Sequence, residues 1–138
     1  MKRLLLLLAL VAVVLAATAW PRLSDVETGR TPEYPDLRPR DYAAGEEAVM
    51  KAAKRCLERL PRWSFVGAGS GPAGSEVRAL HATRVFGFKD DVTIRIRREG
   101  ERTRVSVRSR SRVGAWDFGQ NARNVRELLG ELDRSLGP

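Results

Sequence analysis

The N-terminal part of the chain shows two apolar patterns. Residues 4–20 carry no charged side chain and follow the positive pair Lys2-Arg3. Residues 45–60 place apolar side chains at helical spacing, which predicts an amphipathic helix with Cys56 on its apolar stripe. Pro61 ends this helix, because the residue before a proline disfavours the helical conformation.

The middle of the chain shows the period of β-strands. We expect a short strand at 63–66 and a second at 76–85, with a flexible glycine-rich loop between them. Apolar and polar residues then alternate through 92–97 and again through 103–108, the pattern of half-buried strands. The short turns between the last three strands predict an antiparallel meander.

A second amphipathic helix is predicted near the C-terminus, where Val125 and several leucines recur at helical spacing. Asp117 and Gln120 match a capping box, with Asp117 as the N-cap. Both helices need the same apolar face of the sheet. The pattern therefore predicts an α+β fold: a two-layer domain in the order helix, four-stranded antiparallel meander, helix, with both helices on one face.

The N-terminal apolar run has two interpretations. A cleaved signal peptide fits the positive start, the apolar core and the small residues of Ala17-Thr18-Ala19, with cleavage near Ala19. A membrane anchor needs about 17–25 apolar residues, and this run lies at the lower limit. Both interpretations leave Lys2 and Arg3 on the cytoplasmic side of the membrane and place the chain beyond the apolar run on the other side. We therefore expect an exported protein on the periplasmic side of the inner membrane, either anchored by residues 4–20 or released.

The segment after the apolar run is rich in proline. Three prolines within a few residues exclude a helix there and favour an extended tether. Tyr34, Leu37 and Tyr42 are candidates for pinning this tether to the domain. The expected division is a leader at 1–21, a tether at 22–44 and the α+β domain at 45–136.

The basic residues are mostly arginine. The formal net charge is +8, of which Lys2 and Arg3 supply two, so +6 remains beyond the leader. Arginine suits bidentate binding of carboxylate or phosphate, although a biased genomic composition also explains the count. The single cysteine and single histidine argue against a zinc site, a Cys-His nucleophile pair or a multi-histidine metal centre. We expect no cofactor.

Arginines alternate with the apolar residues of the last two strands. If the apolar side chains face the helices, the arginines face the other way. The face is either solvated, with acids at its rim, or a surface for an anionic partner: a lipid headgroup, lipopolysaccharide or an acidic protein of the envelope. Nucleic acid shares the charge sign but not the expected compartment. The candidate anion-binding residues are Arg95, Arg97, Arg104, Arg108, Arg110 and Arg112.

The turn that follows the last strand is a second candidate site. Ser109, Ser111 and Arg112 could hold an anion together with the N–H groups at the mouth of the helix. Asp117, as the N-cap, would instead occupy those donors and pair with Arg112.

Asp90 and Asp91 form a third candidate. Paired carboxylates serve acid–base chemistry or bind a cation. At the start of a strand, however, aspartates commonly cap turns. We expect them to pair with Arg108 or Arg110 on the neighbouring strand, and we expect His81 to be a structural strand residue.

A longer pattern includes these residues. The composite Arg-Ser-x-Ser-Arg-x-Gly-x-x-Asp-x-Gly-x-Asn at 108–121 contains Gly114, Gly119 and Asn121. With residues 83–92, Trp63 and the extended segment 25–39, it resembles the DUF 1499 family (domain of unknown function 1499), over roughly residues 23–136. The resemblance implies an exported or membrane-associated bacterial domain, with relatives in plastids. It supplies no catalytic residues.

Three functions follow from the sequence. The first is a non-enzymatic envelope domain that binds an anionic membrane surface or another envelope protein through its arginines. The second is a structural or assembly module without a ligand, in which the motif ties the last strand to the last helix. The third is an enzyme of unassigned reaction that uses Asp90, Asp91, Arg108, Asp117 and Asn121.

Overall fold

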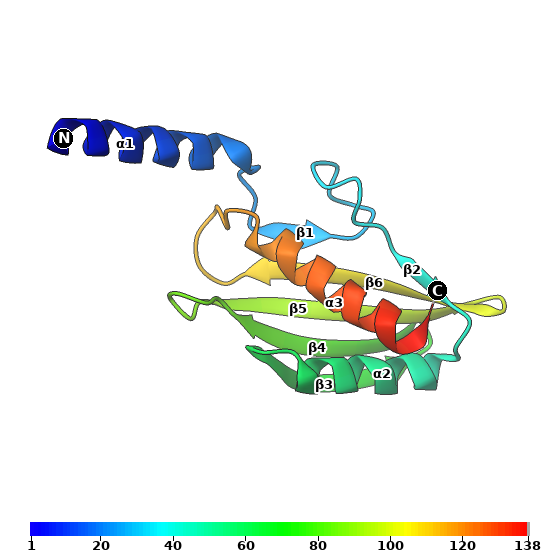
Figure 1. Ribbon diagram of the computed structural model, residues 1–138. Coiled ribbons are helices and arrows are strands. Elements are labelled where there is room, and N and C mark those ends of the chain that lie inside the picture. Colours follow the sequence, from blue (N-terminus) through cyan, green and yellow to red (C-terminus); the bar gives the residue numbers. More distant parts are fainter. Residues whose placement is uncertain (138) are drawn as a thin grey trace.

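The computed structural model describes residues 1–137, and these form three helices and a six-stranded antiparallel sheet (Figure 1). The first helix, α1 (Lys2–Ala19), extends away from the body and buries none of its residues. Its length and apolar composition suffice to cross a membrane. An N-terminal helix of this kind is consistent with a signal peptide or an anchor.

The sheet has the strand order β1-β6-β5-β4-β3, and β2 also pairs with β6. Strands β5 and β6 run antiparallel over their full length, with Ile94 opposite Val107. The strands are β1 (Asp25–Glu27), β2 (Arg40–Tyr42), β3 (Trp63–Gly71), β4 (Gly74–Ala82), β5 (Lys89–Glu99) and β6 (Arg102–Ser111).

The expected four-stranded meander is therefore too small. The two additional strands, β1 and β2, come from the segment expected to be a tether, and they pair with the two halves of β6. Each is three residues long, which is too short for an alternating pattern to be recognised.

The glycine-rich stretch is also not a flexible loop. Residues 67–71 continue β3, and Gly71 faces Gly74 across a tight turn. A register shift between Phe65 and Gly67 marks a bulge in this edge strand. Glycines fit there because an edge strand can bend where it has no side chains to pack.

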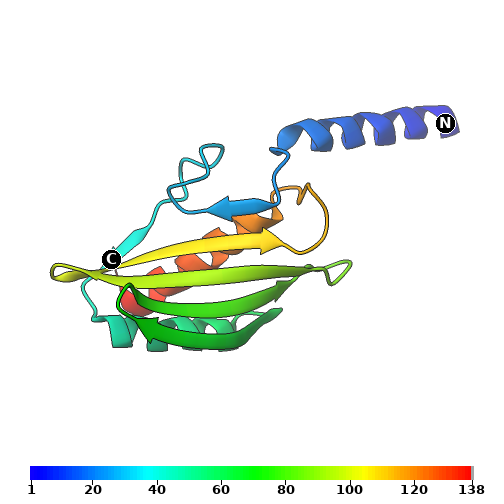
Figure 2. The same cartoon turned by 180° about the vertical axis from the view of Figure 1, so that it is seen from behind.

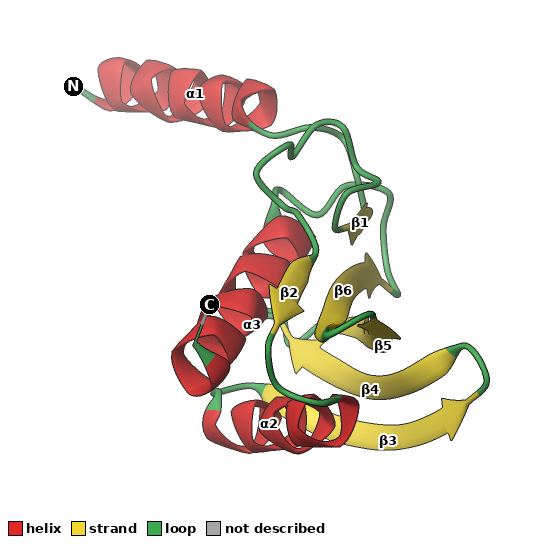
Figure 3. Ribbon diagram, turned by 90° about the vertical axis from the view of Figure 1, so that its right-hand side faces the viewer, coloured by secondary structure: helices red, strands yellow, loops and turns green. Residues whose placement is uncertain are grey.

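The two domain helices lie on one side of the sheet, and Figure 2 shows the strands in front of them. Helix α2 (Glu46–Arg59) packs against β3, β4 and β5, whereas α3 (Gln120–Leu136) packs against β6 and β1. The two helices also contact each other (Figure 3). The placement differs in detail from the expected one, because α3 covers a strand outside the meander.

The core lies between the helices and the sheet, and it includes side chains from the proline-rich segment. Tyr34, Leu37 and Tyr42 are all buried in it. The Tyr42 hydroxyl donates a hydrogen bond to Oδ1 of Asp133 on α3 at 2.7 Å. Cys56 is buried as well, and burial raises the pKa of its thiol. Residues 25–42 are therefore an integral part of the domain.

Candidate functional site

The arginines of β6 meet carboxylates from β1. Arg108 donates from Nε to Oδ1 of Asp25 at 2.9 Å, and its second nitrogen contacts the other carboxylate oxygen. Arg110 lies 4.0 Å from the same carboxylate. The hydrogen bond from Arg108 holds the pKa of Asp25 below its usual value.

The central arginines of the sheet are paired in the same way. Arg95 contacts Glu27 at 2.9 Å, and Arg104 forms a bidentate pair with Asp41 at 2.9 and 3.0 Å. Among residues 1–137, Arg97 is the one member of the predicted anion-binding set without an ion pair.

The open face of the sheet carries a shallow cavity of about 560 Å³, lined by both arginines and glutamates. Positive and negative side chains therefore alternate across this face. Acids from β1 and β2, which the sequence did not reveal as strands, join Glu76 of β4 and Glu99 of β5 there. Together these acids neutralise much of the positive charge expected on this face.

The Asp25–Arg108 pair predicts an acid-dependent contribution to stability. Because the folded pKa of Asp25 is lowered, the contribution is present above the usual aspartate pKa and is lost as the pH falls through the folded value. Both side chains are about one-third exposed, so we expect Asp25→Asn to cost only about 0.5–1 kcal/mol at pH 7. The difference from the wild type should shrink as the pH falls below the usual aspartate pKa of about 3.9 and vanish below the folded pKa, in urea unfolding series. A difference that persists at that pH would contradict the ionic origin.

Asp91 also differs from expectation. It forms a bidentate pair with Arg112, at 2.9 and 2.8 Å, and not with Arg108 or Arg110. Arg112 consequently does not pair with Asp117. The hydrogen bond from Arg112 lowers the pKa of Asp91.

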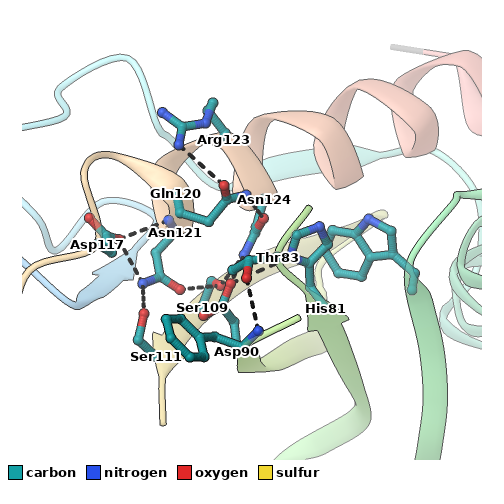
Figure 4. Close-up of polar contacts among 12 residues, drawn as sticks. His81, Thr83, Asp90, Ser109, Ser111, Asp117, Gln120, Asn121, Arg123 and Asn124 are labelled. Atoms are coloured by element: carbon teal, nitrogen blue, oxygen red, sulfur yellow. Dashed lines mark hydrogen bonds and ion pairs between the residues drawn. The ribbon is translucent and has the colours of Figure 1, made fainter. Parts of the chain in front are cut away.

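The motif residues form a buried hydrogen-bonded cluster between β6 and α3 (Figure 4). Asn121 is fully buried and lies at its centre. Its amide nitrogen donates to Ser111 Oγ at 2.7 Å and to Asp117 Oδ2 at 2.6 Å, and its carbonyl oxygen accepts from Ser109 Oγ at 2.6 Å. The same nitrogen also donates to the backbone oxygen of Ser24, just before β1.

The cluster continues to β5 and β4. Asn124 donates to Asp90 Oδ2 at 2.8 Å and to Ser109 Oγ at 3.1 Å. His81 Nδ1 lies 3.4 Å from the same Asp90 oxygen, and its ring packs edge-on against Trp63. Asp90 and Asp91 thus have separate roles: Asp90 points inward to the cluster and Asp91 outward to the solvent-exposed Arg112.

The start of α3 corrects the predicted capping box. The helix begins at Gln120 with Gly119 as its N-cap, so Asp117 lies too early for that role. Phe118 and Gly119 both have positive φ, which delays the helix by two residues. Asp117 still accepts hydrogen bonds from the backbone N–H groups of Gly119 and Asn121, both at 2.8 Å.

Two loops enclose a second cavity at this end of the sheet. We call residues 83–88 and 112–119 together the loop end. The cavity has a volume of about 450 Å³, and polar residues of the cluster line one part of it. Apolar side chains line the rest: Val85, Phe86, Phe88, Val113, Trp116 and Phe118.

The loop end gathers the exposed apolar surface of the domain. Beyond α1, eight large apolar side chains are exposed in the described chain, and six belong to the loop end or to Trp20 beside it. Val85 and Phe86 are 81% and 76% exposed. The other two, Phe65 and Val66, lie on β3. A contiguous exposed apolar patch of this kind is typical of an interaction surface.

The junction between α1 and β1 is fixed to the loop end. The backbone N–H of Asp117 donates to the carbonyl of Leu23 at 2.9 Å. The guanidinium of Arg22 lies 5.1 Å from the ring centroid of Trp116. A Cβ added to Gly119 would lie 2.5 Å from the Trp20 ring, so glycine is needed for this close packing. The exit of α1 therefore adjoins the apolar loops.

Sequence reasoning missed this surface, although a signal was present. Phe86-Gly87-Phe88 and Trp116-Asp117-Phe118 are aromatic clusters in predicted turns, beside glycines. Aromatic residues usually pack in a core, so their concentration in two turns indicates exposed apolar surface of the kind that interaction sites use.

The residues of the enzymatic hypothesis do not meet in one cavity. Asp90 and Asp117 both line the loop-end cavity. Arg108 and Asp91 instead form ion pairs with Asp25 and Arg112. Within residues 1–137, no three or more His, Cys, Asp or Glu side chains are arranged to hold a metal ion.

Comparison with known proteins identifies the family of this chain. The model of the family described as "Protein of unknown function (DUF1499)" matches residues 14–132. The chain belongs to the DUF1499 family. The match confirms the resemblance and includes both loops and the buried cluster of this DUF1499 domain. It also reaches back into α1, to residue 14.

Other comparisons add little to the family assignment. No curated protein matches this DUF1499 chain. Among solved structures, the crystal structure of TTHA0849 from Thermus thermophilus is similar with a TM-score of 0.40 and 17% identity. The similarity covers 80% of this chain and 94% of that one.

Proposed function

We propose that this DUF1499 protein is a non-enzymatic envelope domain whose loop end lies on an anionic membrane surface. The observation that carries the proposal is the concentration of exposed apolar side chains at the end of the domain where α1 joins it. Surface-bound proteins insert such side chains into the headgroup region and gain from the apolar area removed from water.

The geometry supports this orientation if α1 is retained as an anchor. Only residues 20–24 separate the end of α1 from the start of β1, so the domain cannot lie far from the bilayer. In Figures 1 and 2, α1 extends toward the side of the molecule on which the loop end lies. A membrane that contains α1 would therefore meet the loops first.

Charge at the loop end fits the same partner. Arg22, Arg84, Lys89 and Arg123 are exposed around the apolar side chains. Each basic residue near an anionic surface contributes about 1 kcal/mol to binding. The sheet face is a weaker candidate for the anionic contact, because its arginines are largely paired with carboxylates.

A fluorescent probe on the loop tests the proposal in the full-length chain. The probe is placed at position 85 through Val85→Cys, in a Cys56→Ala background, and the protein is reconstituted in vesicles that contain phosphatidylglycerol and spin-labelled lipid. We expect the lipid to quench this probe. A matched probe at position 73 (Ala73→Cys) lies at the opposite end of the nine-residue strand β4, about 30 Å away, and should stay unquenched.

Loss of the apolar side chains should release the loops. Replacing Phe86 and Val113 with serine is expected to reduce the membrane-bound population of the loop end by about tenfold, the effect of losing about 1.4 kcal/mol of apolar burial. The control is Phe65→Ser with Val66→Ser, which removes the same two types of exposed side chain from β3. Aqueous iodide could also quench the probe at position 85. If it quenches this probe equally in the protein without serine substitutions, in the Phe86/Val113 variant and in the control, the proposal is overturned.

The buried cluster favours a second candidate, a structural or assembly module without a ligand. The cluster ties β4, β5, β6 and α3 together through side chains alone. Such a module would keep its function when Phe86 and Val113 are replaced, and its position-85 probe would stay in water.

A further inference from the structure

The loop-end cavity has the size and the lining of a ligand site. Its volume of about 450 Å³ lies within the range of about 300–1,000 Å³ that small-molecule pockets occupy. Two stacked aromatic pairs form its walls: Phe86 with Phe88, at 5.4 Å between ring centroids, and Trp116 with Phe118, at 4.3 Å. These flat apolar walls, one from each loop, suit a hydrocarbon chain better than a polar molecule.

Charged groups occupy a different part of the cavity. Arg84 and Arg123 line it and are exposed, which places their guanidinium groups toward solvent. Within residues 1–137, neither forms an ion pair with a carboxylate, although Arg123 donates to the Phe118 carbonyl at 3.0 Å and to Gln120 Oε1 at 3.2 Å. The lining carboxylates are already engaged, because Asp90 accepts from Asn124, and Asp117 accepts from Asn121 and Gly119. The two arginines are thus the charges of this site that no carboxylate neutralises, and they suit an anionic headgroup.

The backbone beside the cavity is held in an uncommon conformation at Phe118. Phe118 has φ of 52°, an uncommon value for a residue other than glycine, and this conformation typically costs about 1–3 kcal/mol. The hydrogen bonds of Asp117 to Leu23, Gly119 and Asn121 hold the chain on both sides of it. Such strain persists only where the surroundings impose it, and it accompanies binding sites.

We infer that the loop-end cavity binds one anionic phospholipid of the bilayer that holds α1. The acyl chain lies between the Phe86–Phe88 and Trp116–Phe118 walls, and the headgroup contacts Arg84 and Arg123. This inference rests on the proposed function, because the bilayer supplies the ligand. It goes beyond surface attachment, since it predicts a single saturable site with a fixed stoichiometry.

Native mass spectrometry of the full-length chain in a neutral detergent tests the inference. The probes are 1-oleoyl lysophosphatidylglycerol and 1-oleoyl lysophosphatidylcholine, which have the same chain and differ in headgroup charge. We expect a saturable 1:1 adduct with the anionic lipid that is about tenfold tighter than with the zwitterionic one. Adducts of several lipids per chain, with equal affinity for both probes, would overturn the inference.

Charge-matched variants locate the site. Replacing Arg84 and Arg123 with glutamine should remove the preference for the anionic lipid. The control replaces Arg55 and Arg78, which are exposed on α2 and β4, with glutamine and should retain that preference. Equal losses in the two double variants would also overturn the inference.

Fluorescence gives a second readout that does not depend on charge. The measurement uses a Trp20→Phe background, because Trp20 is exposed beside the loop end. Of the two remaining tryptophans, Trp116 lines the cavity, whereas Trp63 is buried beside His81. Addition of the anionic lipid should shift the tryptophan emission, and Trp116→Phe should abolish most of that shift. A shift that persists in Trp116→Phe would overturn the assignment of the site.

The two proposals fail in different ways. If the 1:1 adduct is absent while the probe at position 85 is still quenched by membrane lipid, the surface attachment stands and the single-lipid site falls. If the probe stays in water, the surface attachment itself falls.

Discussion

Replacement of Gly74 by alanine is expected to lower the free energy of unfolding by about 3 kcal/mol or more. Gly74 opens β4 with φ of 113°, a conformation that residues with a Cβ rarely adopt. An added Cβ would lie 2.4 Å from the backbone oxygen of Ile96 on β5. That oxygen belongs to a central strand, so it cannot move away without disturbing the β4–β5 ladder. Urea unfolding followed by circular dichroism measures the effect.

The control for this prediction is Gly69→Ala in the neighbouring strand. A Cβ at Gly69 would meet no atom within 4 Å, and Gly69 is not among the residues with positive φ. Alanine also reduces the entropy of the unfolded chain, so we expect a change within about 1 kcal/mol, on the stabilising side. Similar losses for the two variants would show that the hairpin tolerates no side chain of any kind.

Replacement of Asn121 by alanine should cost about 3 kcal/mol, because it removes the central member of the buried cluster. Ser109 Oγ loses its acceptor, and Asp117 loses a side-chain donor. Buried polar groups without a partner cost about 1–3 kcal/mol each, and the truncation also leaves a small cavity. Thermal unfolding should show the loss as a decrease in Tm of roughly 10 °C.

The matched control is Arg123→Ala, on the exposed side of the same helical turn. Its guanidinium donates to the Phe118 carbonyl and to Gln120, both at the surface. We expect a loss below about 1 kcal/mol. If Asn121→Ala were as mild as Arg123→Ala, water would be replacing the lost partners, and the cluster would not hold α3 to β6.

The sequence predicted the elements with strong periodicity. The alternation at 92–97 and 103–108 became the centres of β5 and β6, and the stripe of 45–60 became α2. These patterns are reliable because apolar side chains recur on the same face of the element over several helical turns or strand residues. The resemblance also led correctly to the DUF1499 family.

The short strands and the ion pairs could not be predicted from the sequence. A strand such as Asp25–Glu27 has one buried residue, Val26, and its place in the sheet is set by contacts with residues more than 80 positions away. Pairing preferences between single residues are too weak to select Asp25 for Arg108, or Arg112 for Asp91, among 21 arginines. The sequence thus indicates which arginines are candidates, but not which carboxylates they pair with.

The candidate site shows the same limit. Asp117 and Asn121 stood out as part of a motif, but their geometry depends on the positive φ of Phe118 and Gly119, which no periodicity reveals. The aromatic residues of the loops follow no periodic pattern, so the sequence predicts turns there and not an exposed apolar surface.

The length of α1 has a consequence for the membrane itself. Its 18 residues span about 27 Å, slightly less than a typical hydrocarbon core of about 30 Å. A short span is matched by local thinning of the bilayer or by added apolar length at one end. In a retained anchor, the aromatic loops fixed to the end of α1 would supply that length, so the domain itself would correct the hydrophobic mismatch and the bilayer would not need to thin around α1.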